Sequence, residues 1–226
     1  MKALIFDSGP LINFSMNGSL HILERLHEEF KGDFLITKEV KKEVIDHPKT
    51  IPRFKLGALK LEILFKKGVI KHAGLTEQEV NELREIREKF MQTANNLFKT
   101  KKRMVHLIDK GECAALALST ILQRKTKIDA PLVVDERTTR MLCEKPENLR
   151  KLMEKKLHTS IVANTKNYEV FKGFKIIRST ELAFIAYKKG LLDLKEPEAL
   201  EAMLYGLKFK GCSISEAEVR EMSGMG

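Results

Sequence analysis

The chain has 226 residues, enough for one large domain or for one domain with a small appendage. Hydrophobic residues make up 43% and charged residues 32%, a balance that excludes intrinsic disorder. Forty-one Lys and Arg against 31 Asp and Glu give a net charge of +10, which suits a polyanionic partner but also the lysine-rich proteins of hyperthermophiles. No apolar stretch approaches the ~20 residues that cross a membrane, so we expect no membrane partner.

Hydrophobic periodicity predicts strands that alternate with helices along the chain. In chain order the strands are 2–6, 33–36, a short one near 69–70, 131–134 and 174–177, and the helices are 11–30, 38–46, 108–124, 136–157 and 181–190. A weak point is expected near Asn17 and Gly18 in the first helix, and a break or kink at Pro146. Strands alternating with helices imply an α/β fold, with a parallel sheet covered by helices on both faces.

Two stretches lie outside this alternation. Thr76 and Glu79 have the spacing of a capping box, and the charged segment beyond them could run helically to Leu107. The tail from Pro197 to Met222 predicts two short helices, the second opened by another capping box at Ser215. We therefore expect a main domain over 1–195 with a helical insertion at about 76–107, and a helical extension over 196–226.

The three cysteines, Cys113, Cys143 and Cys212, are widely scattered and have no C-x-x-C spacing. They predict reduced thiols in the core of a cytoplasmic protein and not a disulfide or zinc framework. The N-terminal residues also lack the pattern of a secretory signal.

Two strands of buried type end directly in an aspartate, the first at Asp7 and the fourth at Asp135. Open α/β sheets bind ligands outside the carboxyl ends of their strands, so these side chains should meet in one crevice. Two carboxylates there repel each other unless a cation lies between them, and Mg²⁺ or Mn²⁺ suits such oxygen ligands. The alternative interpretation is that each aspartate caps the helix that follows it.

Two further acids lie on helices that could face the same crevice. Glu43 lies near the second turn of the helix after the second strand, and Glu112 lies in the first turn of the alanine-rich helix. Asp109 lies three residues before Glu112 on roughly the same helical face, which makes it a candidate supporting acid, and it is also a natural N-cap. Each acid also has a simpler role, since Glu43 could be solvated and Glu112 could interact with the helix dipole.

In their order along the chain, these stretches make the sequence resemble the PIN-domain nucleases. The resemblance rests on ALIFDSGPLINF with Asp7, ITKEVKKEV with Glu43, DKGECAALALS with Glu112, PLVVDERTTRML with Asp135, and the later FKIIRSTELAFIAYKKGLLD. It implies a three-layer sandwich, with a parallel sheet of about five strands between layers of helices. It also implies hydrolysis of RNA phosphodiester bonds with Mg²⁺ or Mn²⁺, in toxin–antitoxin pairs or in RNA processing.

The resemblance also assigns roles to individual residues. The acids implied as metal ligands and catalytic residues are Asp7, Glu43, Glu112 and Asp135. Glu136 follows Asp135 where many relatives have a second aspartate, and Thr180, or its neighbour Ser179, stands where relatives place a small hydroxyl or glycine. RNA is the implied substrate, and an antitoxin protein and a homodimer are the other implied partners.

Three departures from the family pattern put the substrate in doubt. The segments 76–107 and 146–171 are longer than a compact PIN domain needs, and the final motif reads Arg178-Ser179-Thr180-Glu181 where relatives often have a glycine. The densest run of basic residues is a candidate for RNA binding or, equally, a solvated helix end. It consists of Lys99, Lys101, Lys102 and Arg103.

Other functions were weighed on the same residues. A phosphatase of the haloacid-dehalogenase type needs a second aspartate where this chain has Gly9, and a P-loop nucleotidase needs a G-x-x-x-x-G-K-[ST] motif that is absent. A non-catalytic RNA-binding protein on the same fold, or a DNA structure-specific nuclease in which segment 76–107 acts as an arch, are the remaining alternatives. A binding module gains little from clustered carboxylates where phosphates must lie, which favours the nuclease.

Overall fold

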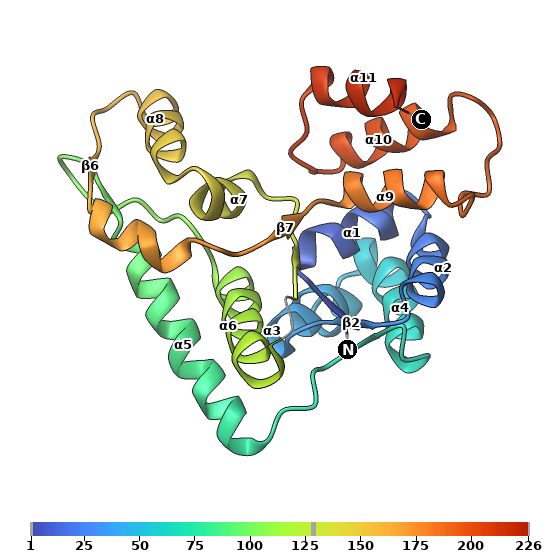
Figure 1. Ribbon diagram of the computed structural model, residues 1–226, viewed down its shortest axis with the longest axis horizontal. Helices are drawn as coiled ribbons and strands as arrows, with labels where there is room; N and C mark the ends of the chain where they lie inside the picture. The colour runs from blue at the N-terminus through green and yellow to red at the C-terminus, as the bar shows by residue number, and fades with distance from the viewer. Residues whose placement is uncertain (1, 128–129, 226) are drawn as a thin grey trace.

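The structure, a computed structural model, describes residues 2–127 and 130–225 and contains a parallel sheet at its centre (Figure 1). The order of strands in this sheet is β3-β2-β1-β5-β7, and every pairing within it is parallel. The strands are β1 (Ala3–Phe6), β2 (Asp33–Leu35), β3 (Ile70–Lys71), β5 (Leu132–Val133) and β7 (Ile176–Ile177). The predicted α/β fold with five parallel strands is therefore confirmed.

Helices cover both faces of the sheet. The first face carries α6 (Lys110–Thr126), with α5 (Glu77–Asn95) packed on it, and side chains of α7 (Arg137–Glu144) and α8 (Pro146–Leu157) join the same core from beside the sheet. The second face carries α1 (Ser8–Met16), α2 (Leu20–Phe30), α3 (Lys38–Lys41), the π-helical turn η1 (Lys42–Asp46), α4 (Pro52–Lys66) and α9 (Ser179–Lys188). The arrangement is a three-layer sandwich.

Strand alternation explains how one sheet supplies two cores. In β1, Ala3 and Ile5 join the core beneath α5 and α6, whereas Leu4 and Phe6 join the core beneath α1, α2 and α4. Because successive side chains of a strand point to opposite faces, a strand buried on both faces must be apolar throughout. This requirement accounts for the uninterrupted run Ala3–Phe6 and for its detection in the sequence.

The insertion at 76–107 is helical over only part of its length. Thr76 caps α5 in the predicted capping box, with its Oγ1 accepting from Glu79 N and its N donating to Glu79 Oε2. The helix ends at Asn95, and the prediction that it continues to Leu107 was wrong. The chain instead forms β4 (Phe98–Lys99), which pairs antiparallel with β6 (Val162–Ala163).

The β4–β6 pair, α7, α8 and the 3₁₀ segment η3 (Thr165–Phe171) form a lobe beside the sheet, which we call the arm (Figure 1). It combines the two extended segments of the sequence, 76–107 and 146–171. Pro146 separates α7 from α8 as predicted, because it opens the second helix at its first position.

The tail forms α10 (Ala199–Phe209) and α11 (Glu216–Gly224), which lie over α9 (Figure 1). Ser215 opens α11 in the predicted capping box. Cys113, Cys143 and Cys212 are buried and free, as predicted. Among the described residues, no helix is long and apolar enough to cross a membrane.

Candidate functional site

Asp7 and Asp135 lie side by side at the carboxyl ends of β1 and β5. The register pairs Phe6 with Val133, and Asp7 N donates to Val133 O at 3.0 Å. Gly9 lies close to both aspartates, since a Cβ on Gly9 would lie 3.6 Å from Asp135 Cβ and 3.8 Å from Asp7 Oδ2. The chain leaves β1 for β2 on one side and later reaches β5 on the other, so these aspartates mark the switch point where such sheets bind ligands.

Asp7 is a buried acid with acidic neighbours. Its exposure is 5%, and burial, followed by the charge of Glu112 and more weakly that of Glu43, raises its pKa from 3.8 to about 7. The backbone N–H groups of Ser8 and Gly9 offset part of this rise; the Gly9 contact to Oδ2 is long, at 3.5 Å. Asp7 does occupy the N-cap of α1, but a 3.5 Å contact is a weak cap.

Glu43 reaches the same place from η1. Its carboxylate lies against α6, because a Cβ on Gly111 would lie 3.0 Å from Glu43 Oε1. The residue as a whole is exposed, but its carboxyl end is partly buried. This burial raises the pKa of Glu43, and the charges of Asp109 and Glu39 raise it further, whereas a hydrogen bond with Ser8 lowers it. Glycine at position 111 permits this approach, and π-helical turns such as η1 are frequent at functional sites.

Glu112 is half-buried at the start of α6. Its Oε2 accepts from Asp109 N at 2.9 Å, in the geometry of a capping box. Burial raises its pKa; the backbone N–H groups of Glu112 and Asp109 lower it, and the charges of Asp109 and Glu136 raise it further. Glu112 thus caps the helix and also acts electrostatically on Asp7.

Asp135 is fixed by three separate elements. Its Oδ2 accepts from Asn13 Nδ2 of α1 at 2.5 Å, and its Oδ1 accepts from Ser179 N of α9 at 2.7 Å. Its backbone oxygen accepts from Ser213 N, in the loop before α11, at 3.0 Å. The carboxylate therefore has one orientation, and both of its oxygens already have donors.

Sequence reasoning missed Asn13 and the role of the Ser179 backbone. Asn13 is 3% exposed between Leu11 and Phe14, so the signal was an amide on the apolar face of a helix six residues after Asp7. The family resemblance pointed to Ser179 only for its hydroxyl, whereas its contribution comes from a backbone N–H whose position depends on where α9 begins.

The other predicted site residues have different places. Asp109 Oδ1 pairs with His106 Nε2 at 2.7 Å, and Glu136 Oε2 caps α7 by accepting from Thr139 N at 2.8 Å. Thr180 Oγ1 lies 3.7 Å from the Cys212 sulfur in the interior. The basic run lies on the arm, with Lys99 at the end of β4 and the other members, Lys101, Lys102 and Arg103, exposed in the turn after it; the run is therefore not a helix end.

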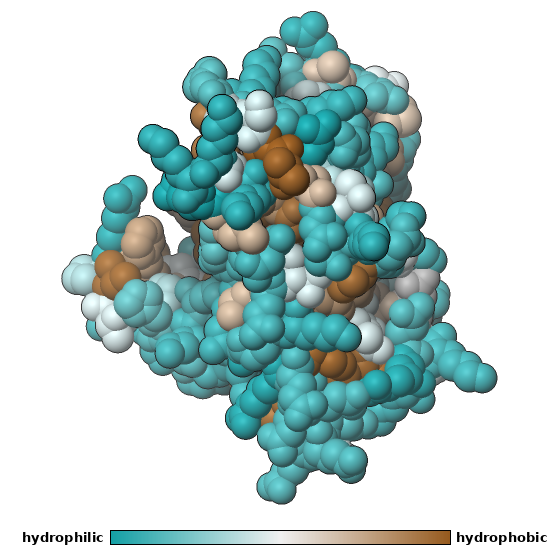
Figure 2. Space-filling model, turned by 90° about the vertical axis from the view of Figure 1, so that its left-hand side faces the viewer, coloured by the Kyte–Doolittle hydropathy of each residue, from teal (hydrophilic) through white to brown (hydrophobic). Residues whose placement is uncertain are grey.

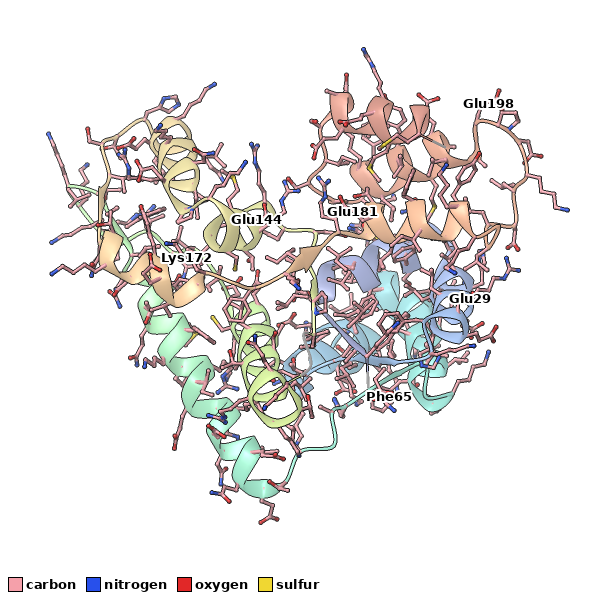
Figure 3. All side chains as sticks on the ribbon, in the orientation of Figure 1. Glu29, Phe65, Glu144, Lys172, Glu181 and Glu198 are labelled. Carbon is pink, nitrogen blue, oxygen red and sulfur yellow. The ribbon has the colours of Figure 1, made fainter. Side chains whose placement is uncertain are left out.

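The side chains of Arg178, Glu181 and Glu218 form an ion-pair network between α9 and α11. Glu181 lies in the first turn of α9 (Figure 3). Arg178 is buried at the N-cap of α9, and its guanidinium binds Glu181 and Glu218 of α11. Its Nη1 also donates to Ser213 O at 3.0 Å, in the loop that holds Asp135. This network connects the tail to the carboxyl edge of the sheet.

The four acids Asp7, Glu43, Glu112 and Asp135 thus come together from four segments of the chain. Within the described residues, no lysine or arginine forms an ion pair with any of them. Nor are three His, Cys, Asp or Glu side chains of residues 2–127 and 130–225 grouped tightly enough to hold a metal ion directly. Mutual repulsion of uncompensated carboxylates keeps such side chains apart.

Fold and site together define a class: a three-layer α/β sandwich with an uncompensated acidic cluster at the carboxyl edge of its sheet. Comparisons of the chain with known protein families, with curated proteins and with solved structures gave no match.

Proposed function

We propose that this protein is a metal-dependent nuclease that hydrolyses RNA phosphodiester bonds. The observation that carries the proposal is the state of Asp7, a buried carboxyl group with a pKa of about 7 beside Glu112 and Glu43, with no cationic side chain among the described residues to balance it. A buried charge normally has a partner, and a divalent cation is the partner that this set of oxygen donors fits.

The acids have different parts in this proposal. Asp7, Glu43 and Glu112 are the residues that would hold the ion, since each has a pKa raised by burial and by other carboxylates. Asp135 supports them from outside, because Asn13 and Ser179 occupy its oxygens. A bound Mg²⁺ or Mn²⁺ supplies an activated water and stabilises charge on the phosphoryl group.

The chain itself supplies position and a low-dielectric setting. Asn13 and Ser179 fix Asp135, Gly9 lies close to Asp135 and Asp7, and Gly111 lets Glu43 approach α6. The Asp135 carboxylate, held in one orientation, loses little entropy beside a bound ion, whereas Asp7, Glu43 and Glu112 would have to move closer together to hold that ion. The surplus of basic residues in the chain favours a polyanionic substrate.

The test is cleavage of end-labelled single-stranded RNA with Mn²⁺, with Mg²⁺ and with EDTA. We expect cleavage that requires the metal and is lost in Asp7→Asn, whereas Asp46→Asn, at an exposed acid paired with Lys41, remains active. Cleavage that persists in Asp7→Asn would contradict the proposal, and so would metal-independent RNA binding without cleavage. A parallel assay with branched DNA separates an RNase from a DNA structure-specific nuclease.

Metal binding is measured separately by thermal unfolding with and without Mn²⁺. A bound ion stabilises the folded state by mass action, so the melting temperature of the native chain should rise. The rise should be lost in Asp7→Asn and retained in Asp46→Asn.

We further propose a role in a toxin–antitoxin pair or in RNA processing, with an antitoxin protein or a second copy of the chain as partner. Isolation of the protein from the native host as a lone monomer would contradict both partners.

A further inference from the structure

A cavity on the arm gathers three basic side chains. Arg103, His106 and Lys156 line a space of about 290 Å³ together with Met104, Val105, Thr138, Met153 and Leu157. No acidic residue lines it. Its volume is near the lower end of the roughly 300–1,000 Å³ typical of ligand pockets, which suits a single nucleotide unit.

Two of the three basic side chains in this cavity, Arg103 and Lys156, are free to bind an anion, whereas His106 already pairs with Asp109. Arg103 and Lys156 are exposed, and within the described ranges neither forms an ion pair. Thr100 Oγ1 accepts from Lys102 N at 3.3 Å and from Arg103 N at 3.1 Å, so Arg103 stands on an ordered turn. A side chain on an ordered turn loses less entropy on binding a phosphate than one on a mobile loop, because its backbone is already fixed.

The cavity also offers apolar contact. Met104 and Leu157 are 43% and 37% exposed, although both are large apolar side chains. A nucleotide has this same mixed character, because its phosphate needs cations and its base and sugar need apolar surface. Figure 2 views the molecule from the side of the arm and shows a mostly hydrophilic surface with small hydrophobic areas within it.

Two contacts join the cavity to the acidic cluster. His106 pairs with Asp109, whose charge acts on both Glu43 and Glu112. Thr138 lies on α7, which is capped by Glu136, and the charge of Glu136 acts on Glu112. A single-stranded nucleic acid that crosses the acidic cluster could therefore continue onto the arm. The arm supports this path, since residues 137–158 hold seven basic and three acidic residues.

We propose that this cavity is a nucleotide-binding subsite for single-stranded nucleic acid, in which Arg103 and Lys156 bind a backbone phosphate and Met104 and Leu157 contact the base or sugar. The subsite rests on the proposed function, because it binds the strand that the acidic cluster would cut. The sequence predicted RNA contacts only from the basic run at 99–103. The subsite includes Arg103 of that run and also contains Lys156, His106 and an apolar surface.

The test measures binding of a fluorescent single-stranded RNA in EDTA, by anisotropy at several salt concentrations. Arg103→Ala with Lys156→Ala should weaken binding about tenfold at low salt and reduce the salt slope by about 0.7, the value for the one phosphate that the two side chains share. The control is Arg220→Ala with Lys60→Ala, which removes the same charges from exposed positions on α11 and α4 and should change affinity less than about threefold. Equal losses in both variants, or no loss in either, would overturn the subsite.

Two further measurements complete the test. Met104→Ala should weaken binding without changing the salt slope, since it removes apolar contact and no charge; a change in the slope alone would overturn the base contact. Inorganic phosphate at constant ionic strength should not displace the RNA, and full displacement would assign the cavity to free phosphate. The binding test is independent of the cleavage test, because it is run in EDTA. If the protein binds RNA as expected here but does not cleave it in the metal-dependent assay, the proposed function is refuted and the subsite is retained.

Discussion

At the scale of single residues, Asp7 makes the stability of the metal-free protein depend on pH. Its pKa is about 7 when folded and about 3.8 when unfolded, so the folded state holds the proton more tightly between these values. The associated stability is fully present below pH 3.8 and is lost as the pH rises through 7. Above that pH the ionised carboxyl destabilises the fold, by on the order of 2–4 kcal/mol.

Asp7→Asn should therefore stabilise the protein in EDTA at pH 8. The difference from the native chain should shrink as the pH falls through 7 and vanish only well below pH 3.8, where Asp7 is protonated in both the folded and the unfolded state. Urea unfolding at a series of pH values measures this. Asp46→Asn should show no such trend, and a pH-independent effect of Asp7→Asn would contradict the raised pKa.

Gly111 allows stability and function to be separated. Gly111→Ala places a methyl group 3.0 Å from Glu43 Oε1, so the carboxylate must move by a few tenths of an ångström. Alanine is favoured over glycine within a helix by up to about 1 kcal/mol, so stability should be kept or raised. Cleavage and Mn²⁺ affinity should fall about tenfold. Full activity would show that the approach of Glu43 to α6 is not required.

The sequence predicted the acids but not their supports. Asp7 and Asp135 could be found because each directly follows a buried strand, and parallel strands end at a common edge. Asn13 and the Ser179 backbone act on Asp135 across 122 and 44 residues of chain, and such contacts are decided by helix packing. The position of Glu43 likewise depends on the π-helical turn η1, which periodicity does not reveal.

At the scale of elements, the ion pair between Arg178 and Glu218 attaches α11 to α9. Contacts from Ser215 and Arg178 outweigh the effect of burial and lower the pKa of Glu218 to about 2. This stabilisation is present above the unfolded pKa of 4.5 and is lost as the pH falls toward 2. The Glu218 side chain is 39% exposed, so solvent screening limits the contribution to about 1 kcal/mol.

Glu218→Gln should thus lower the free energy of unfolding at pH 7 by about 0.5–1 kcal/mol. The loss should diminish below pH 4 and disappear near pH 2, as the native Glu218 becomes protonated. Chemical unfolding at pH 7 and pH 3 distinguishes this outcome. Glu221→Gln, at an exposed position of the same helix, is the matched control and should leave stability unchanged.

The strands of the central sheet were predicted, including the two-residue strands β3, β5 and β7, because each lies in a short apolar run of the sequence. The helices α6 to α8 were predicted from composition and periodicity, and Pro146 marked the break between α7 and α8. The pair β4 and β6 has two residues in each strand, joined across more than sixty residues, so no local pattern indicated it. Helix was therefore expected over 98–107, where β4 lies, and no element was predicted over 158–171, where β6 and η3 lie.

At the scale of the whole molecule, the tail belongs to the same folded unit as the site. Leu204 of α10 is fully buried, and Ser213 binds the backbone of Asp135. Leu204→Ala should cost about 2–5 kcal/mol and lower the main melting temperature by several degrees. Leu194→Ala, at a 60% exposed position, should change it by less than about one degree. A main transition unchanged by Leu204→Ala would make the tail an independent appendage.

The two edges of the central sheet bear on how this protein behaves at high concentration. The edge strands β3 and β7 contain two residues each, and β3 ends on the exposed Lys71. A strand from another molecule would find very little unpaired backbone there, and charged side chains at a sheet edge discourage such addition. We therefore expect the protein to resist edge-to-edge aggregation at high concentration, because both edge strands of its central sheet are short.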